Sequence, residues 1–272
     1  MPRFRIFTDP VWPHRSSLLV APLTRLTAKR GYYVPSRYDV TYDGPGRTAA
    51  ITPKPGSGAP AEVRKAAVKT TEALDKLAFD YVVSHGALPA CVGYRGYRHT
   101  LCTSINHVVC HGIPSDRPLK DGDIINIDVT VIVDGWHGDT SRMYYVGDVK
   151  RKAQRLVEIT YEAMMRGIAV AKPGATTGDI GYAIQSFAED QERCSVVRDF
   201  CGHGLGRLFH DEPNIIHVGS PGQGAVLRPG MFFTIEPMIN LGKPYVKILS
   251  DGWTAVTRDR SLSAQFEHSI GV

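Results

Sequence analysis

The chain has 272 residues, of which 43% are hydrophobic and 22% are charged, and its formal net charge at pH 7 is +5. This length allows one large core or two small ones. No apolar run approaches the ~20 residues that a membrane helix needs, so we expect a globular protein without a membrane span.

The basic excess lies at the start of the chain. Residues 1–60 hold nine Lys and Arg against three Asp, which leaves 23 basic and 24 acidic side chains for the rest. Pro and Gly interrupt this region in DPVWPH, YDGPG and TPKPGSGAP, a pattern typical of irregular backbone. We expect residues 1–58 to form an irregular basic extension and residues 59–272 to form the folded domain. An organelle transit sequence is the alternative, although no clean amphipathic helix supports it.

Three later segments have the periodicity of amphipathic helices. They are TTEALDKLAFDYVVSHG from Thr70, RKAQRLVEITYEAMMRGIAVAKPG from Arg151, and TTGDIGYAIQSFAED from Thr176. The two Thr-Thr starts lie 106 residues apart, which indicates a faint internal duplication. A long helix, 151–171, precedes the second copy. The matching span of the first copy is rich in Gly and Pro and has room only for a short helix from Pro60 to Val68, so one backing helix is expected to be missing.

The run GDIINIDVTVIVDGWHGDTS, residues 122–141, predicts a hairpin closed by a two-residue Asp-Gly turn at 134–135. In that register Thr130 faces Asp139, and Asp128 lies on the same face as a diagonal neighbour of Asp139. Two carboxylates this close raise each other's pKa unless a cation lies between them. The alternative is that both aspartates are solvated. A three-residue loop would place them on opposite faces.

Further acids and histidines follow in short motifs. His203 and His210 lie in FCGHGLGRLFHDEPN, Glu236 ends the apolar run of GMFFTIEPM, and Glu267 lies in SLSAQFEHSI. Each alone is typical of a solvated loop or strand end. Together with the two aspartates they form a hard, oxygen-rich donor set that suits two divalent ions such as Mn, Fe, Co or Zn, rather than a thiolate zinc site. Such a pair can activate one water and polarise a carbonyl.

Five motifs carry a resemblance to the type I methionine aminopeptidases: CTSINHVVCHGIP, NIDVTVIVDGWHGDTS, GHGLGRLFHDEPN, FTIEPM and SAQFEHS. They occur in the family's order from about Thr70 onward, and no long insert follows FHDEPN, which argues against the type II enzymes. The resemblance implies an α+β pita-bread fold, in which helices back a curved, mainly antiparallel sheet in two pseudo-symmetric halves. The family's long first helix is not evident, and the last strand is short. We therefore expect reduced stability.

The resemblance also assigns roles in the removal of an initiator methionine that precedes a small residue. Asp128 would chelate one metal ion, Asp139 and Glu267 would bridge both ions, and His203 with Glu236 would complete the other site. A hydroxide held between the ions would attack the first peptide bond, with Glu236 as the proton acceptor. The substrate would be contacted by two histidines, His111 of CHGIP and His210.

A methionine pocket is implied by soft and aromatic side chains, which suit a thioether. The residues that match the family's pocket are Cys91, Tyr94, Tyr97, Cys102, Phe209 and Trp253. The other three cysteines are expected to be ordinary buried thiols. Five cysteines without a CxxC pair favour a reduced, cytoplasmic location.

Two other functions stay open at this point. One is an X-Pro aminopeptidase or prolidase on the same fold, which the NHVVCHGIP motif and the pocket disfavour. The other is a non-catalytic or destabilised relative that binds RNA, ribosome or protein through the basic extension; such relatives commonly lose metal ligands, and all five are present here. We expect a monomer that acts on the N-termini of nascent chains, with at most transient ribosome contact and no membrane or specific nucleic acid.

Overall fold

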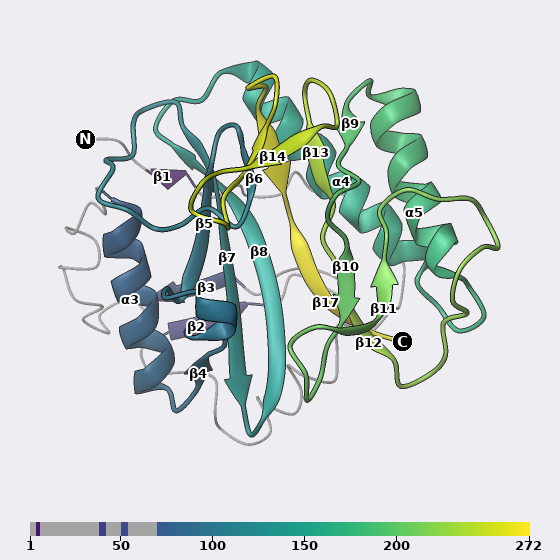
Figure 1. The fold of residues 1–272 in the computed structure, drawn as a ribbon, viewed down its shortest axis with the longest axis horizontal. Coiled ribbons are helices and arrows are strands. Elements are labelled where there is room, and N and C mark those ends of the chain that lie inside the picture. Colours follow the sequence, from purple (N-terminus) through teal and green to yellow (C-terminus); the bar gives the residue numbers. More distant parts are fainter. Residues whose placement is uncertain (1–3, 6–37, 42–49, 54–69) are drawn as a thin grey trace.

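The computed structural model describes residues 4–5, 38–41, 50–53 and 70–272 (Figure 1). The short helix expected from Pro60 to Val68 lies outside the described residues, as does most of the basic extension. Within that extension the structure describes three short strands, β1 (Phe4–Arg5), β2 (Tyr38–Thr41) and β3 (Ala50–Pro53). The proposed boundary at residue 58 stays a prediction.

A nine-stranded sheet with antiparallel pairings forms the centre of the molecule. Its order is β11-β10-β12-β17-β8-β7-β4, with β1 beside β8 and β5 beside β7. The last strand in the chain, β17, therefore lies between the two halves (Figure 1). The bounds are β4 (Leu88–Pro89), β5 (Leu101–Ile105), β7 (Ile124–Val133), β8 (Trp136–Val146), β10 (Gly202–Gly204), β11 (Asp211–Ile215), β12 (Phe232–Ile235) and β17 (Glu267–Gly271).

Smaller sheets complete the domain. One has the order β16-β13-β9, another β14-β15-β6, and β2 pairs with β3. Their remaining bounds are β6 (Val108–Cys110), β9 (Ser195–Val196), β13 (Met238–Asn240), β14 (Val246–Ile248), β15 (Ala255–Thr257) and β16 (Ser263–Gln265).

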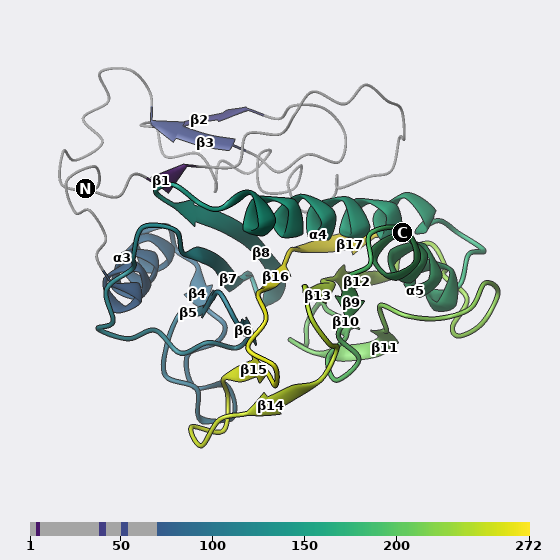
Figure 2. The same cartoon turned by 90° about the horizontal axis from the view of Figure 1, so that it is seen from above.

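The three helices predicted after residue 59 are confirmed. They are α3 (Thr71–Ser84), α4 (Arg151–Val170) and α5 (Thr177–Gln185), and α5 continues into a π-helical turn at Ser186–Gln191. A 3-10 turn, η1, covers Tyr94–Gly96. Figure 2 shows α4 running along one face of the sheet, beside β8 and β17.

The duplication is visible at the starts of α3 and α5. Thr70 caps α3 by accepting a hydrogen bond from the Ala73 N–H, and Thr176 forms a capping box with Asp179. Each capping threonine also makes an isolated antiparallel bridge, Thr70 with Pro118 and Thr176 with Val226. The α+β pita-bread fold expected from the sequence is thus confirmed, with corresponding elements in its two halves.

The two halves differ in how well their helices are covered. Helix α4 buries nine residues and belongs to the main core, which also includes α5 and β12. Helix α3 buries only Thr71 and Val82, while Leu77, Phe79 and Val83 stay exposed. Among the described residues no helix precedes α3 as α4 precedes α5. Helix α3 thus presents exposed apolar side chains, while the absence of a backing helix before it stays a prediction.

A membrane span is not among the described elements, because none of their helices combines the length and apolarity that crossing a bilayer requires.

Candidate metal centre and active site

The β7–β8 hairpin has the register predicted from its turn. Asp134 and Gly135 both adopt positive φ, 53° and 76°, as a two-residue type I′ turn requires. Thr130 pairs with Asp139, and Asp128 lies two residues along β7 on the same face. The Thr130 hydroxyl donates a hydrogen bond of 2.7 Å to Asp139 Oδ1.

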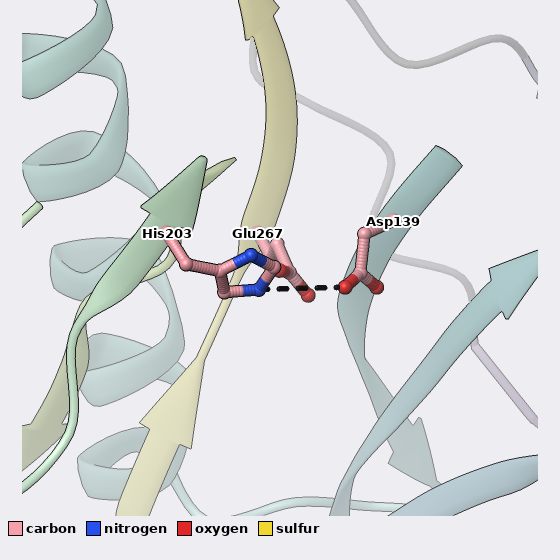
Figure 3. A group of neighbouring side chains, drawn as sticks. All are labelled: Asp139, His203 and Glu267. Atoms are coloured by element: carbon pink, nitrogen blue, oxygen red, sulfur yellow. Dashed lines mark ion pairs between the residues drawn. The ribbon is translucent and has the colours of Figure 1, made fainter. Parts of the chain in front are cut away.

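Three residues from the second half of the chain complete the cluster. His203 lies on β10, Glu267 begins β17, and Glu236 follows the end of β12. Ligand atoms of Asp139, His203 and Glu267 lie within 4.8 Å of one another (Figure 3). His203 Nε2 is 3.7 Å from Asp139 Oδ2 and 3.6 Å from Glu236 Oε1. The antiparallel order of β12, β17 and β8 places these side chains at one point of the sheet.

The carboxylates of this cluster are strongly perturbed. Burial raises the pKa of Asp139 to about 7 and that of Glu236 to about 8, and Asp139 adds repulsion at Glu236. The pKa values of Asp128 and Glu267 are raised well above the usual range, again by burial first and then by Asp139. Four acids thus share one site, and the desolvation that burial causes disfavours their ionised forms.

A pair of divalent cations fits this donor set. Asp128 Oδ1 is buried and has no hydrogen-bond partner among the described residues, and buried acceptors without partners are costly. The Nδ1 atom of His203 lies 3.1 Å from the Gly204 carbonyl oxygen, which leaves Nε2 facing Asp139 and Glu236. Such a backbone bond fixes the ring orientation of a metal-binding histidine. Two cations would offset the burial and the mutual repulsion that raise the pKa values of these carboxylates.

A threonine joins the two ligands that come from neighbouring strands. The Thr234 hydroxyl donates a 2.7 Å hydrogen bond to Glu236 Oε1 and accepts one of 3.0 Å from the His203 backbone N–H. Gln265 Nε2 lies 3.3 Å from the other Glu236 oxygen, Oε2. These contacts fix the carboxylate of Glu236, whose side chain is 13% exposed.

The predicted pocket residues lie together beside this centre. Cys91, Tyr97 and Cys102 form a buried cluster against which Phe209 and Trp253 pack. The rings of Tyr97 and Trp253 meet edge to face at 4.9 Å. Cys102 on β5 pairs directly with Asp128 on β7, so the pocket adjoins the carboxylates. Tyr94 packs on the rings of Phe209 and His210, at 4.8 and 5.1 Å.

Two further histidines, His210 and His111, lie beside the metal ligands and the pocket. The His210 ring lies 4.1 Å from that of His203, and desolvation together with the charges of His203 and His111 lowers its pKa. His111 has φ of 55° and meets the rings of Phe200 and Trp253 edge to face, at 5.3 and 6.3 Å. Burial lowers the pKa of His111. Both imidazoles are therefore neutral near pH 7.

Several residues of the site were not predicted from the sequence. Thr234, Ile113 and His137 contact the ligands or the pocket, and His217 accepts a hydrogen bond from the Glu236 backbone N–H. Only Thr234 carried a local signal, because it stands two residues before Glu236 on the same strand face.

Comparison with known proteins agrees with this geometry. A methionine aminopeptidase of Rickettsia prowazekii is 63% identical over 205 residues, covering 75% of this chain and 78% of the relative. A methionine aminopeptidase of Escherichia coli K12 is 54% identical over 210 residues, covering 76% and 79%. The crystal structure of the Rickettsia prowazekii methionine aminopeptidase aligns with a TM-score of 0.74 at 62% identity, covering 75% of this chain and 82% of that one. The model of metallopeptidase family M24 matches residues 50–272. The chain therefore belongs to metallopeptidase family M24.

Proposed function

We propose that this metallopeptidase removes the N-terminal methionine from nascent chains whose next residue is small. The observation that carries the proposal is the contact between two features: four carboxylates with one imidazole, and an adjoining pocket of thiols and aromatic rings. The identity of 54–63% to proteins named methionine aminopeptidase supports it.

The cluster supports a metal-ligand assignment. Asp128, Asp139, His203, Glu236 and Glu267 would hold two divalent ions. When bound, these ions supply an activated water and polarise the carbonyl of the scissile bond. Co, Mn, Fe and Zn all suit the donor set.

The side chains around the cluster serve the peptide. Glu236 accepts the proton of the attacking water, because its carboxylate stands beside His203 and is held by Thr234. His210 donates a hydrogen bond to the substrate carbonyl oxygen as negative charge develops there. His111 contacts the amino end or the scissile amide.

The pocket selects the first residue. Two thiols, Cys91 and Cys102, present polarizable sulfur, and the rings of Tyr94, Tyr97, Phe209 and Trp253 present apolar faces. A methionine side chain is unbranched and makes favourable contacts with both. We further propose a cytoplasmic monomer that reaches nascent N-termini with at most transient ribosome contact.

The test is hydrolysis of Met-Ala-Ser by the metal-stripped protein after addition of Mn, Co, Fe or Zn. An X-Pro peptide is assayed in parallel to separate this activity from that of a prolidase-type enzyme, and Asp139→Ala is the inactive control. We expect release of methionine with at least one metal. No turnover with any metal would contradict the proposal and favour a non-catalytic relative. Salt-sensitive RNA binding would then be the next measurement.

A further inference from the structure

One buried histidine contacts the site from outside the proposed ligand set. His217 lies two residues after β11, and its side chain is fully buried, with 0% exposure. Its Nε2 atom accepts a hydrogen bond of 3.1 Å from the backbone N–H of Glu236. The imidazole thus contacts the main chain of the residue that we assign as both ligand and proton acceptor.

The fold holds the segment that carries His217 against α5. Two glycines of α5 permit this close packing, because a Cβ at Gly181 would lie 2.5 Å from the Val218 carbonyl oxygen and one at Gly178 would meet Gln223. The Gly219 N–H also donates a hydrogen bond of 3.2 Å to the Gln185 side chain. The segment that carries His217 is therefore packed against helix α5, which fixes its position.

The Glu236 N–H needs an acceptor at this point in the chain. Strand β12 ends at Ile235, whose partner is His268, and Pro237, which follows Glu236, has no N–H. The backbone hydrogen bonds of the β12 ladder therefore end before Glu236. A buried N–H without a partner is unfavourable. The imidazole replaces the missing strand carbonyl.

Among the described residues, the bond to Glu236 is the polar contact of the His217 ring, because its other nitrogen has no partner. An Nε2 that accepts leaves the proton of the neutral ring on Nδ1, and His217 Nδ1 is buried without a hydrogen-bond partner among the described residues. Burial also lowers the pKa of His217, to about 3, which keeps the ring neutral. An apolar side chain would avoid the unpaired Nδ1 but would leave Glu236 N–H unpaired.

We propose that His217 is a positioning residue that fixes the backbone of Glu236, so that its carboxylate stays beside His203 and Thr234. The inference rests on the proposed function for its catalytic consequence. Its effect on the metal site can be measured without turnover. Mutation of a residue that orients a metal ligand commonly lowers metal affinity or activity by about 10–100-fold.

Two amide substitutions separate the effect of losing the acceptor atom from the effect of losing the imidazole ring. In His217→Gln the side-chain amide reaches the position of Nε2, whereas in His217→Asn it reaches only that of Nδ1. Asn240→Leu is the matched control. Asn240 is also fully buried, its side-chain Nδ2 donates a hydrogen bond to the Lys243 carbonyl, and its Oδ1 has no partner among the described residues. Calorimetric titration with Mn²⁺ alone gives metal affinity, and Met-Ala-Ser hydrolysis gives kcat and KM separately.

We expect His217→Asn to weaken Mn²⁺ binding and to lower kcat by about 10–100-fold with KM little changed, and His217→Gln to retain most of both. Asn240→Leu should lower the unfolding temperature and leave the metal affinity and kcat of the folded enzyme unchanged. Equal values for the Asn and Gln variants, or an equal loss in Asn240→Leu, would overturn the positioning role. If wild type bound Mn²⁺ but failed to cleave Met-Ala-Ser, the proposed function would fail, while the titrations would still decide the role of His217.

Discussion

Removal of the metal ions should make stability fall as the pH rises from 7 to 8. In the metal-free fold burial raises the pKa of Glu236 to about 8, and it also raises those of Asp128 and Glu267 well above their usual range. Between pH 7 and 8 the folded state therefore keeps protons that the unfolded chain has released. Stability falls with pH wherever the folded state binds more protons. The histidines with lowered pKa act in the opposite direction, and they do so mainly below about pH 7.

The size of the effect follows from the number of protons retained. A fully retained proton costs about 1.4 kcal/mol per pH unit. Glu236, with a pKa of about 8 in the folded state, keeps most of one proton over this interval, which gives roughly 1 kcal/mol between pH 7 and pH 8. For a chain of this size 1 kcal/mol shifts the unfolding temperature by about 2–4 °C. The metal-free protein should therefore unfold about 2–4 °C lower at pH 8 than at pH 7.

Thermal unfolding of chelator-treated and Mn²⁺-loaded protein at the two pH values measures this. The loaded protein serves as the internal reference, because groups remote from the site titrate in both samples. We expect the gap in unfolding temperature to widen at pH 8. Chelator-treated Asp139→Asn protein, which lacks one acid, should lose less stability than chelator-treated wild type over the same interval. A gap of equal size at both pH values would refute the electrostatic reasoning.

Three further outcomes are expected. Thr130→Val removes the hydrogen bond to Asp139 Oδ1 and should weaken Mn²⁺ binding by about 10–100-fold in a titration; unchanged affinity would contradict a role in orienting Asp139. Trp253→Ala should raise KM for Met-Ala-Ser about tenfold through lost apolar contact, and an unchanged KM would remove Trp253 from the pocket. The exposed apolar residues of α3 predict a lower unfolding temperature than that of the Escherichia coli relative in the same Mn²⁺ buffer, and equal temperatures would show that this surface is covered.

Local chemistry was enough to predict one half of the site. The Asp-Gly turn fixed the register of β7 and β8, and with it the common face of Asp128 and Asp139, because side chains alternate across a strand and paired positions follow from the loop length. The helices were equally accessible, since their threonine caps and apolar periodicity are local signals.

The other half depends on contacts between distant parts of the chain. Nothing near His203, Glu236 or Glu267 specifies that β10, β12 and β17 meet β8, so their convergence was expected only from family motifs. His217 had no signal at all. Its role comes from the end of the β12 ladder and from glycines on α5, which are tertiary features.

The place of β17 has a consequence for how the protein matures during translation. This strand lies between β12 and β8 and carries Glu267, so it both closes the central sheet and supplies a carboxylate. Until residues 267–271 leave the ribosome, the β8 positions that pair with β17 lack their partner and can pair with strands of other chains. Because domains fold as synthesis proceeds from the N-terminus, the enzyme should gain activity only after its last strand has emerged.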